Sequence, residues 1–262
     1  MRIAYALMLC LLPHLALAAE TVVEIESPRG VKVRALEEIP NHPTASVILL
    51  AGGSGDLEMA ADGTIGSDLR NNQLVRTRHL YAQAGLAVLT PDLGPGIAAL
   101  PRYRASTEHA QDLGALVGHL RGIAAPVVIV GTSRGSLSAA NLAGHAQGPE
   151  RPDAVVLTSA FLSLQSDISA ATFAGGSPSP LTMPFLLMGH DADSCPETPA
   201  GNIDPFRRWL TASPRVDVEI LSGGSGMVGK ADRCGSSSPH GYLGLDPKVV
   251  EIITGWVAGL PR

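Results

Sequence analysis

Aromatic residues are scarce in this chain, and so are charged ones. Of its 262 residues, only 4% are Phe, Trp or Tyr and 16% are Asp, Glu, Lys or Arg. The hydrophobic core must therefore be built mainly from Ala, Val, Leu and Ile. The formal net charge is -5 and no long run of Lys and Arg occurs, which argues against a nucleic-acid partner because phosphate binding needs clustered cations. The length suits one α/β domain and leaves little room for a second.

The chain also lacks an apolar stretch of the length that a membrane span needs. Its amino terminus instead has the features of a signal peptide: Arg2 gives a short positive region, residues 3–12 are almost wholly apolar, and Ala16-Leu17-Ala18 fits an A-x-A cleavage site. We therefore predict a signal peptide over residues 1–18, a single domain over residues 19–262, and a periplasmic or secreted location. The alternative is an uncleaved anchor, for which the apolar run is short.

Cysteine is rare as well, with Cys10, Cys195 and Cys234 as the three examples. Cys10 falls inside the predicted leader, so two cysteines remain after cleavage. Export would place them in an oxidising compartment, where an even number of cysteines usually forms disulfides. The alternative is two free, buried thiols. A redox role is not expected, because the spacing of the pair is not C-x-x-C.

Short continuous apolar runs, typical of strands buried on both faces, recur along the chain. Two mixed segments precede them and predict a partly exposed antiparallel ribbon. Because helical patterns separate the runs, we predict an α/β fold with a mainly parallel sheet and helices on both faces. The predicted strands are 21–26, 31–36, 47–50, 87–90, 127–130, 154–157, 185–188 and, at an edge, 216–221. The predicted helices are 74–83 ending at Gly85, 107–120 with Ser106 as N-cap, 137–146, 205–210 opening at Asp204-Pro205, and 247–260 with Asp246 as N-cap.

The segment Phe161 to Met183 has no clear periodicity and is rich in Ser, Ala, Gly and Pro. A segment of this length between two strands is either a functional lid or a disordered loop. It is too short for a large cap domain, so we expect a fairly open site.

The segment Gly131-Thr132-Ser133-Arg134-Gly135 matches the pattern G-x-S-x-G. The pattern alone is weak in a chain with 29 glycines, but here it directly follows a predicted strand and opens a helix. In that setting the glycines allow a sharp turn that exposes the serine hydroxyl at a helix N-terminus. We therefore identify Ser133 as the candidate nucleophile. The alternative is an ordinary strand-to-helix turn with a serine cap.

A serine hydroxyl needs a base to activate it, and the base needs an acid to orient it. After a turn of this kind the partners follow in the order acid, then histidine. His240 lies in the loop between the last strand and the last helix, where the base is expected, whereas the other histidines fall in the leader, before the core strands, on helices or, for His190, at a strand end. The acid is Asp193 or Asp191, both just past strand 185–188, and we favour Asp193.

Acyl transfer also needs hydrogen-bond donors for the oxyanion of the tetrahedral intermediate. The backbone N–H of Arg134, next after the candidate nucleophile, is one. The second is expected from the glycine-rich loop of residues 51–55, with Gly53 or Ser54 as the donor. A plain flexible loop or a phosphate-binding turn is the alternative for this segment, and the dinucleotide pattern G-x-G-x-x-G is absent.

Together these segments resemble the α/β-hydrolase superfamily, in particular its small exported bacterial serine hydrolases, mostly of unassigned substrate. The resemblance covers nearly the whole of residues 19–262. It implies the α/β-hydrolase fold without a large cap domain, and it implies Ser133 as nucleophile, Asp193 as acid and His240 as base. The first loop lacks the His-Gly-Gly-Gly form of many lipases, so a lipase-like activity is not implied. The residues that carry the resemblance are 50–55, 131–135, 190–195 and 238–242.

A disulfide between Cys195 and Cys234 would join the loop of the acid to the loop of the base. Cys195 lies two residues after Asp193, and Cys234 lies six residues before His240. We hypothesise that the bridge holds the acid and the base in their working geometry. On this hypothesis Cys234→Ser lowers turnover more than it lowers folding stability.

The predicted activity is that of a serine hydrolase, similar to a carboxylesterase, which cleaves a small ester-type substrate through an acyl-enzyme. No metal and no organic cofactor is expected, and the zinc pattern H-E-x-x-H does not occur. Two other interpretations stay open: a peptidase or other acyl hydrolase on the same fold, and a non-catalytic binding protein that keeps the scaffold.

Overall fold

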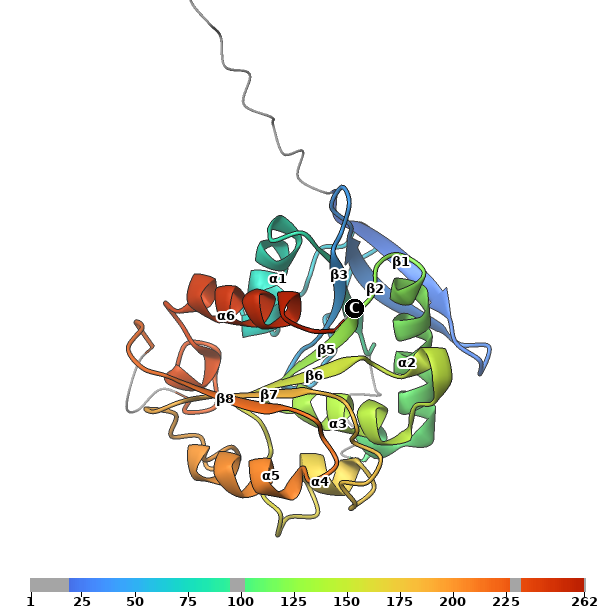
Figure 1. Cartoon of the computed structure of the whole chain (residues 1–262). Helices are drawn as coiled ribbons and strands as arrows, with labels where there is room; N and C mark the ends of the chain where they lie inside the picture. Colours follow the sequence, from blue (N-terminus) through green and yellow to red (C-terminus); the bar gives the residue numbers. More distant parts are fainter. Residues whose placement is uncertain (1–18, 95–101, 227–231, 262) are drawn as a thin grey trace, which may run out of the picture.

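The computed structural model contains an eight-stranded sheet, and every predicted strand overlaps one of its strands (Figure 1). The structure describes residues 19–94, 102–226 and 232–261. The strands are β1 (Thr21–Glu26), β2 (Lys32–Glu38), β3 (Ala45–Leu50), β4 (Leu86–Asp92), β5 (Val127–Thr132), β6 (Ala154–Thr158), β7 (Phe185–His190) and β8 (Val216–Leu221).

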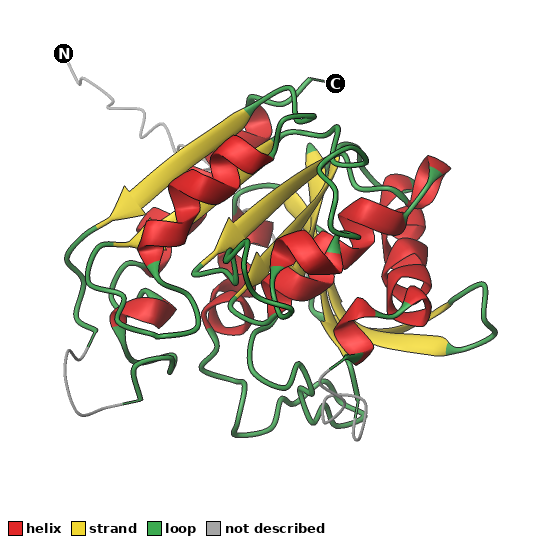
Figure 2. Ribbon diagram, turned by 90° about the horizontal axis from the view of Figure 1, so that it is seen from below, coloured by secondary structure: helices red, strands yellow, loops and turns green. Residues whose placement is uncertain are grey.

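The strands follow the order β1-β2-β4-β3-β5-β6-β7-β8 across the sheet. β1 pairs antiparallel with β2, and β2 pairs antiparallel with β4, with Val23 opposite Ala35 and Leu36 opposite Thr90. All pairs from β4 to β8 are parallel. The antiparallel ribbon, the mainly parallel sheet and the edge position of β8 confirm the predictions. Figure 2 shows that the direction of the strands turns from one edge of the sheet to the other, which is the usual twist.

Helices cover both faces of the sheet, as predicted: α1 and α6 lie on one face, and α2, α3, α4 and α5 lie on the other (Figure 1). The helices are α1 (Gln73–Gln83), α2 (Thr107–Arg121), α3 (Gly135–His145), α4 (Ala170–Phe173), α5 (Ile203–Trp209) and α6 (Asp246–Ala258). Short 3-10 turns are η1 (Tyr103–Ala105), η2 (Gly148–Glu150), η3 (Ala200–Asn202) and η4 (Pro239–Gly241). α5 begins at Ile203, two residues earlier than the predicted start at Pro205.

The central strands are buried on both faces. In β3, Ile48 packs with Leu113 of α2, whereas its neighbour Val47 packs on the other face with Leu74 of α1 and Ile253 of α6. Successive side chains of a strand point to opposite faces, so a strand covered on both sides needs apolar residues at every position. This explains why the sequence shows continuous apolar runs here rather than alternation.

The helix ends agree with the sequence signals at α1 and α2 but not at the starts of α5 and α6. Ser106 caps α2 with its side chain, and Gly85 follows α1 with a φ of +87°. The prediction that Asp246 caps α6 was wrong: the N-cap is Leu245, and Asp246 is the first helical residue. Its carboxylate accepts two hydrogen bonds from the guanidinium of Arg76 instead.

The segment 161–183 between β6 and β7 is part of the folded domain. It contains α4, which Ser169 caps, and it buries Phe161 and Phe173 against Leu137 of α3. This packing rules out a disordered loop. In the described part of the chain the segment forms no separate cap domain, as expected from its length.

The predicted signal peptide, residues 1–18, lies outside the described residues. The sheet begins soon after it, because β1 starts at Thr21. Over the residues that the structure describes, no helix has both the length and the apolar character required to cross a membrane.

Candidate active site

The three candidate catalytic residues lie in segments that follow the carboxyl ends of parallel strands. Ser133 follows β5, Asp193 follows β7, and His240 lies in η4 between β8 and α6. Because β5, β6, β7 and β8 are parallel, their carboxyl ends meet at the same rim, which is where open α/β sheets bind ligands. The topology thus gathers residues from distant parts of the sequence.

Ser133 occupies a tight turn between β5 and α3. Its backbone φ is +50°, in the left-handed region that strains residues other than glycine. Three hydrogen bonds hold the turn: the Ser133 N–H donates to the carbonyl of Thr158 at 3.0 Å, and the hydroxyl and N–H of Ser136 donate to the carbonyl of Ser133 at 2.6 and 3.0 Å. The strained residue therefore has a fixed position at the N-terminus of α3.

The two glycines of the G-x-S-x-G pattern allow this turn because no side chain fits at either position. A Cβ on Gly131 would lie 2.5 Å from the carbonyl oxygen of Gly135. A Cβ on Gly135 would collide with the carbonyl of Leu50 at the end of β3. The start of α3 thus packs directly on the backbone of the two neighbouring strands.

Asp193 and His240 form a buried pair. The imidazole Nδ1 of His240 donates to Oδ2 of Asp193 at 3.0 Å, and the two side chains are 4% and 2% exposed. The Cys195 N–H donates to Oδ1 of Asp193 at 2.9 Å, and the Thr198 hydroxyl lies 3.1 Å from the same Nδ1. These contacts fix the orientation of the ring and leave Nε2 as the nitrogen that can accept a proton.

The Nε2 atom of His240 is buried and has no hydrogen-bond partner among the described residues, so the Ser133 hydroxyl does not bond to it in this structure. Ser133 and His240 are nevertheless both hydrogen-bonded to residues at the end of β6. Thr158 accepts the N–H of Ser133, and the hydroxyl of the next residue, Ser159, donates to the carbonyl of His240 at 2.8 Å. Catalytic hydrogen bonds are often long in unliganded enzymes and shorten when substrate binds.

Asp191, the alternative acid, lies in a different environment. Its side chain is 56% exposed, and its carboxylate lies 3.2 Å from Nδ1 of His190 rather than against the base. His190 is buried and bridges two loops, since its Nε2 lies 3.0 Å from the carbonyl of Gly223 and its Nδ1 accepts the N–H of Ala192 at 3.0 Å. His190 therefore supports the acid loop and is not placed as a base.

The residues predicted as oxyanion donors border Ser133. A Cβ on Gly52 would lie 2.9 Å from the Cβ of Ser133, so the loop after β3 passes directly against the candidate nucleophile. Gly53, the next residue, has a φ of +56°. The backbone N–H groups of Gly53, Ser54 and Arg134 have no acceptor among the described residues. They are therefore available to a ligand.

Comparison with known proteins identifies the architecture. No protein-family model matches the sequence, and no curated protein matches it either. Solved structures do match. Dienelactone hydrolase from Anabaena variabilis has a TM-score of 0.65 at 18% identity and covers 94% of this chain and 100% of that chain. Carboxyl esterase 2 from the fungus Tuber melanosporum has a TM-score of 0.61 at 14% identity, with coverages of 92% and 87%. The esterase Pf2001 from Pyrococcus furiosus has a TM-score of 0.59 at 16% identity, with coverages of 92% and 93%.

The chain has the α/β-hydrolase fold. In this fold a serine at the turn after the central strand is the usual nucleophile, and the residue after it gives one oxyanion donor. Ser133 and Arg134 occupy these two positions.

The disulfide expected from the sequence is present in this α/β-hydrolase fold. Cys195 and Cys234 are bonded, with their Cα atoms 4.8 Å apart. Cys195 also donates its N–H to Asp193, so the bridge is attached to the acid by a backbone hydrogen bond. The loop after β7 and the loop before α6 are therefore linked covalently beside the acid–base pair.

Two side chains that support the α/β-hydrolase site were missed by the sequence reasoning. Thr198 contacts both members of the acid–base pair, and Arg76 of α1 donates to the carbonyls of Ser236 and Gly241 at 3.2 and 2.7 Å. Arg76 thus holds the loop that carries the base. Neither residue belongs to a local sequence pattern. Their partners are distant in sequence: Asp246, which accepts from Arg76, lies 170 residues after it.

One group of potential metal ligands occurs among the described residues, formed by Glu20, Glu38 and His79. Glu20 is already paired with Arg78, and Glu38 with His79. The group is therefore a cluster of paired side chains from β2, α1 and the residue before β1, and we assign no metal to it.

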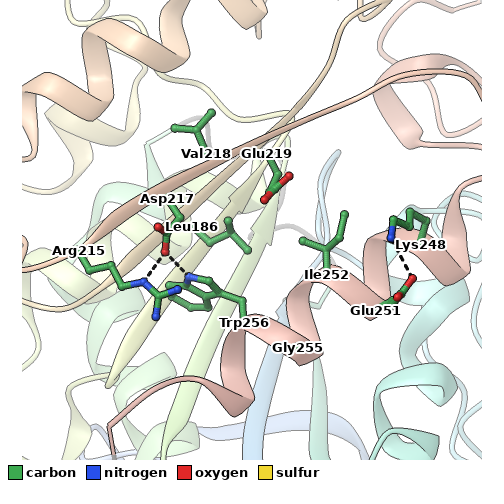
Figure 3. Close-up of a pocket in the computed structure, with 10 residues that line it drawn as sticks. All are labelled: Leu186, Arg215, Asp217, Val218, Glu219, Lys248, Glu251, Ile252, Gly255 and Trp256. Carbon is green, nitrogen blue, oxygen red and sulfur yellow. Dashed lines mark hydrogen bonds and ion pairs between the residues drawn. The ribbon is translucent and has the colours of Figure 1, made fainter.

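A groove between β8 and α6 lies away from the candidate active site, toward the amino end of β8 (Figure 3). Four of its five charged side chains bond to each other in pairs, and the fifth, Glu219, makes no ion pair among the described residues. Asp217 accepts from Arg215 and from the Trp256 indole, and Lys248 pairs with Glu251. Because these charges are already neutralised within the groove, they do not indicate a ligand.

Proposed function

We propose that this protein is a serine hydrolase that cleaves small ester-type substrates, with Ser133 as nucleophile, His240 as general base and Asp193 as the acid that orients the base. The observation that carries the proposal is the buried Asp193–His240 pair, which leaves Nε2 of His240 free near the strand end that also holds Ser133. The esterases among the proteins of similar fold agree with it.

The reaction proceeds by two acyl transfers. Nε2 of His240 takes the proton of the Ser133 hydroxyl while its oxygen attacks the ester carbonyl. Asp193 stabilises the imidazolium, and the N–H of Arg134 together with that of Gly53 or Ser54 stabilises the oxyanion. His240 then protonates the departing alcohol. A water molecule, deprotonated by the same imidazole, hydrolyses the acyl-enzyme and restores the free serine.

The test of this function is hydrolysis of p-nitrophenyl esters of graded acyl length, together with labelling by a fluorophosphonate probe. Wild type and the control Ser179→Ala, which removes an exposed hydroxyl, should hydrolyse short esters and form the adduct, and Ser133→Ala should do neither. Labelling that persists in Ser133→Ala contradicts the proposed nucleophile. Faster cleavage of aminoacyl amides than of esters would identify a peptidase, and an unlabelled wild type would identify a binding protein.

We also propose that residues 1–18 are a signal peptide and that the domain of residues 19–262 acts in the periplasm or outside the cell. The disulfide between Cys195 and Cys234 supports export, because such bonds persist in oxidising compartments. Mass spectrometry of the protein from the periplasm or the medium should give a chain that starts at Ala19. A chain that retains residue 1 in that fraction contradicts cleavage.

A further inference from the structure

A buried arginine holds the loop that was predicted to supply an oxyanion donor. Arg104 lies in η1, before α2, and is 8% exposed. Its Nη1 donates to the hydroxyl of Ser138 in α3 at 2.7 Å. Its Nη2 donates to the carbonyl oxygens of Ala51, Gly53 and Ser54 at 3.4, 3.4 and 3.1 Å. Arg104 thus ties the loop after β3 to α3, the helix that follows Ser133.

The charge of Arg104 is not neutralised by a carboxylate among the described residues. Burial, with a smaller contribution from Arg134, lowers the pKa of Arg104 to about 10, so the guanidinium stays charged at neutral pH. On the far side of Ser138, at 2.8 Å, His109 has its pKa lowered to about 3 by burial and by Arg104, and it stays neutral. An unpaired buried charge destabilises a fold. The contacts of the Arg104 guanidinium therefore indicate which role offsets this cost.

Those contacts determine where the backbone N–H groups of the loop point. The carbonyl of one residue and the N–H of the next belong to one planar trans peptide and point in opposite directions. A cation bonded to the carbonyls of Ala51, Gly53 and Ser54 therefore turns the N–H groups of the following residues away from itself. A charged donor on a carbonyl also polarises the peptide and strengthens its N–H as a donor.

We propose that Arg104 is a positioning residue of the oxyanion hole: its guanidinium clamps residues 51–54 through their carbonyls and keeps the loop's N–H donors aimed at the developing oxyanion. This inference rests on the proposed function. The N–H of Ser54 shares a peptide with the carbonyl of Gly53, so Arg104 orients it directly. The N–H of Gly53 shares a peptide with the carbonyl of Gly52, and Arg104 holds it through the bonded carbonyls on either side. The residue acts through the loop and does not touch the substrate.

The variant Arg104→Met tests the proposal, because it keeps an unbranched side chain as far as the position of Nε and removes the charge and the donors. Turnover of p-nitrophenyl acetate is measured per active site, with the sites counted by exhaustive fluorophosphonate labelling. We expect kcat per labelled site to fall by about 10- to 100-fold, while KM changes by less than about threefold. The fall in kcat should not exceed the one that follows removal of a whole oxyanion donor. Affinity for a trifluoromethyl ketone, whose adduct carries the oxyanion, should fall in parallel with kcat/KM.

Two further variants separate positioning from folding. Arg104→Lys keeps the charge and one donor, so it should recover part of the lost turnover. Arg34→Met is the matched control, because Arg34 also donates to two carbonyls of this connection, those of Met59 and Ala60 at 3.0 Å, but farther from the nucleophile. It should leave kcat per site within about twofold of wild type. If Arg104→Met does not fold, Ser138→Ala is the substitute, because it removes the hydroxyl to which Nη1 of Arg104 donates. It should also lower kcat per site.

The outcomes distinguish this inference from the proposed function. A wild type that neither hydrolyses esters nor takes the probe overturns the proposed function, and the role of Arg104 with it. A reactive wild type together with an Arg104→Met variant of equal kcat per site overturns the role of Arg104 alone. Fewer labelled sites with an unchanged rate per site would assign Arg104 to folding only, which also overturns the proposal.

Discussion

His240 donates from Nδ1 to Oδ2 of Asp193 across 3.0 Å, although 47 residues separate the two in sequence. The same Nδ1 lies 3.1 Å from the Thr198 hydroxyl, and the other oxygen of the carboxylate is occupied by the N–H of Cys195. The carboxylate of Asp193 is thus held by its own loop as well as by His240. A loop that supplies two hydrogen bonds and a disulfide gives the imidazole one orientation, and general-base catalysis depends on that orientation.

The first prediction compares the two aspartates of the acid loop. Asp193→Asn keeps the shape of the side chain but lets the amide donate to Nδ1, which favours the wrong tautomer of His240. We expect kcat for a short p-nitrophenyl ester to fall by about 10³- to 10⁴-fold with KM little changed. Asp191→Asn, at an exposed side chain two residues away, should keep kcat within about twofold. Equal losses in both variants would refute Asp193 as the orienting acid.

The second prediction concerns the bridge between the acid loop and the base loop. Cys234→Ser opens the disulfide and leaves a thiol at Cys195, so the two loops can move apart. Because small displacements of catalytic groups are costly, turnover per fluorophosphonate-labelled site should fall by about 10- to 100-fold. The melting temperature should also fall, but the variant should stay folded at the temperature of the assay. Treatment of wild type with dithiothreitol should reproduce the loss of turnover. Unchanged turnover per site in the folded variant would show that the bridge has no influence on the pair.

The fold was predictable wherever burial leaves a local trace in the sequence. Val47 and Ile48 face opposite sides of the sheet and both are fully buried, so the strand reads as a continuous apolar run. The order of the strands leaves no such trace: β4 lies between β2 and β3 because of contacts between distant segments. The cap of α6 was mispredicted for the same reason, since the distant Arg76 engages the carboxylate of Asp246.

The site divides in the same way. Ser133 follows a strand within a glycine pattern and His240 lies in a predictable loop, so both could be chosen as candidates from the sequence. Thr198 and Arg104 could not, because their roles depend on partners 42 and 50 residues away and on the burial of their side chains. An isolated threonine or arginine has no local pattern that distinguishes such a role from surface exposure.

The third prediction follows from the backbone strain at Ser133. With a φ of +50°, a residue with a Cβ is strained here and glycine is not. Ser133→Gly should therefore be more stable than Ser133→Ala by about 1 kcal/mol in urea unfolding, although neither variant can form an acyl-enzyme. The reverse order is expected inside α3, where Ser138→Gly should be less stable than Ser138→Ala. If glycine is the less stable choice at both positions, the turn is not strained in solution.

The fourth prediction is a pH dependence of stability that His109 contributes. Burial and the charge of Arg104 lower its pKa in the folded protein to about 3, from an ordinary value of 6.5. Between these two values the unfolded chain carries the proton and the folded chain does not, so the unfolded state binds more protons and the free energy of unfolding falls as the solution is acidified. The slope from this one group is at most about 1.4 kcal/mol per pH unit.

His109→Gln removes the titrating group, so its unfolding free energy should fall less steeply than that of wild type from pH 6.5 down to pH 4, and the two should run parallel above about pH 7.5. Urea unfolding of both proteins across this range measures the difference. Curves that stay parallel through the acidic range would mean that His109 is protonated in the folded protein, which its position beside the buried guanidinium of Arg104 argues against.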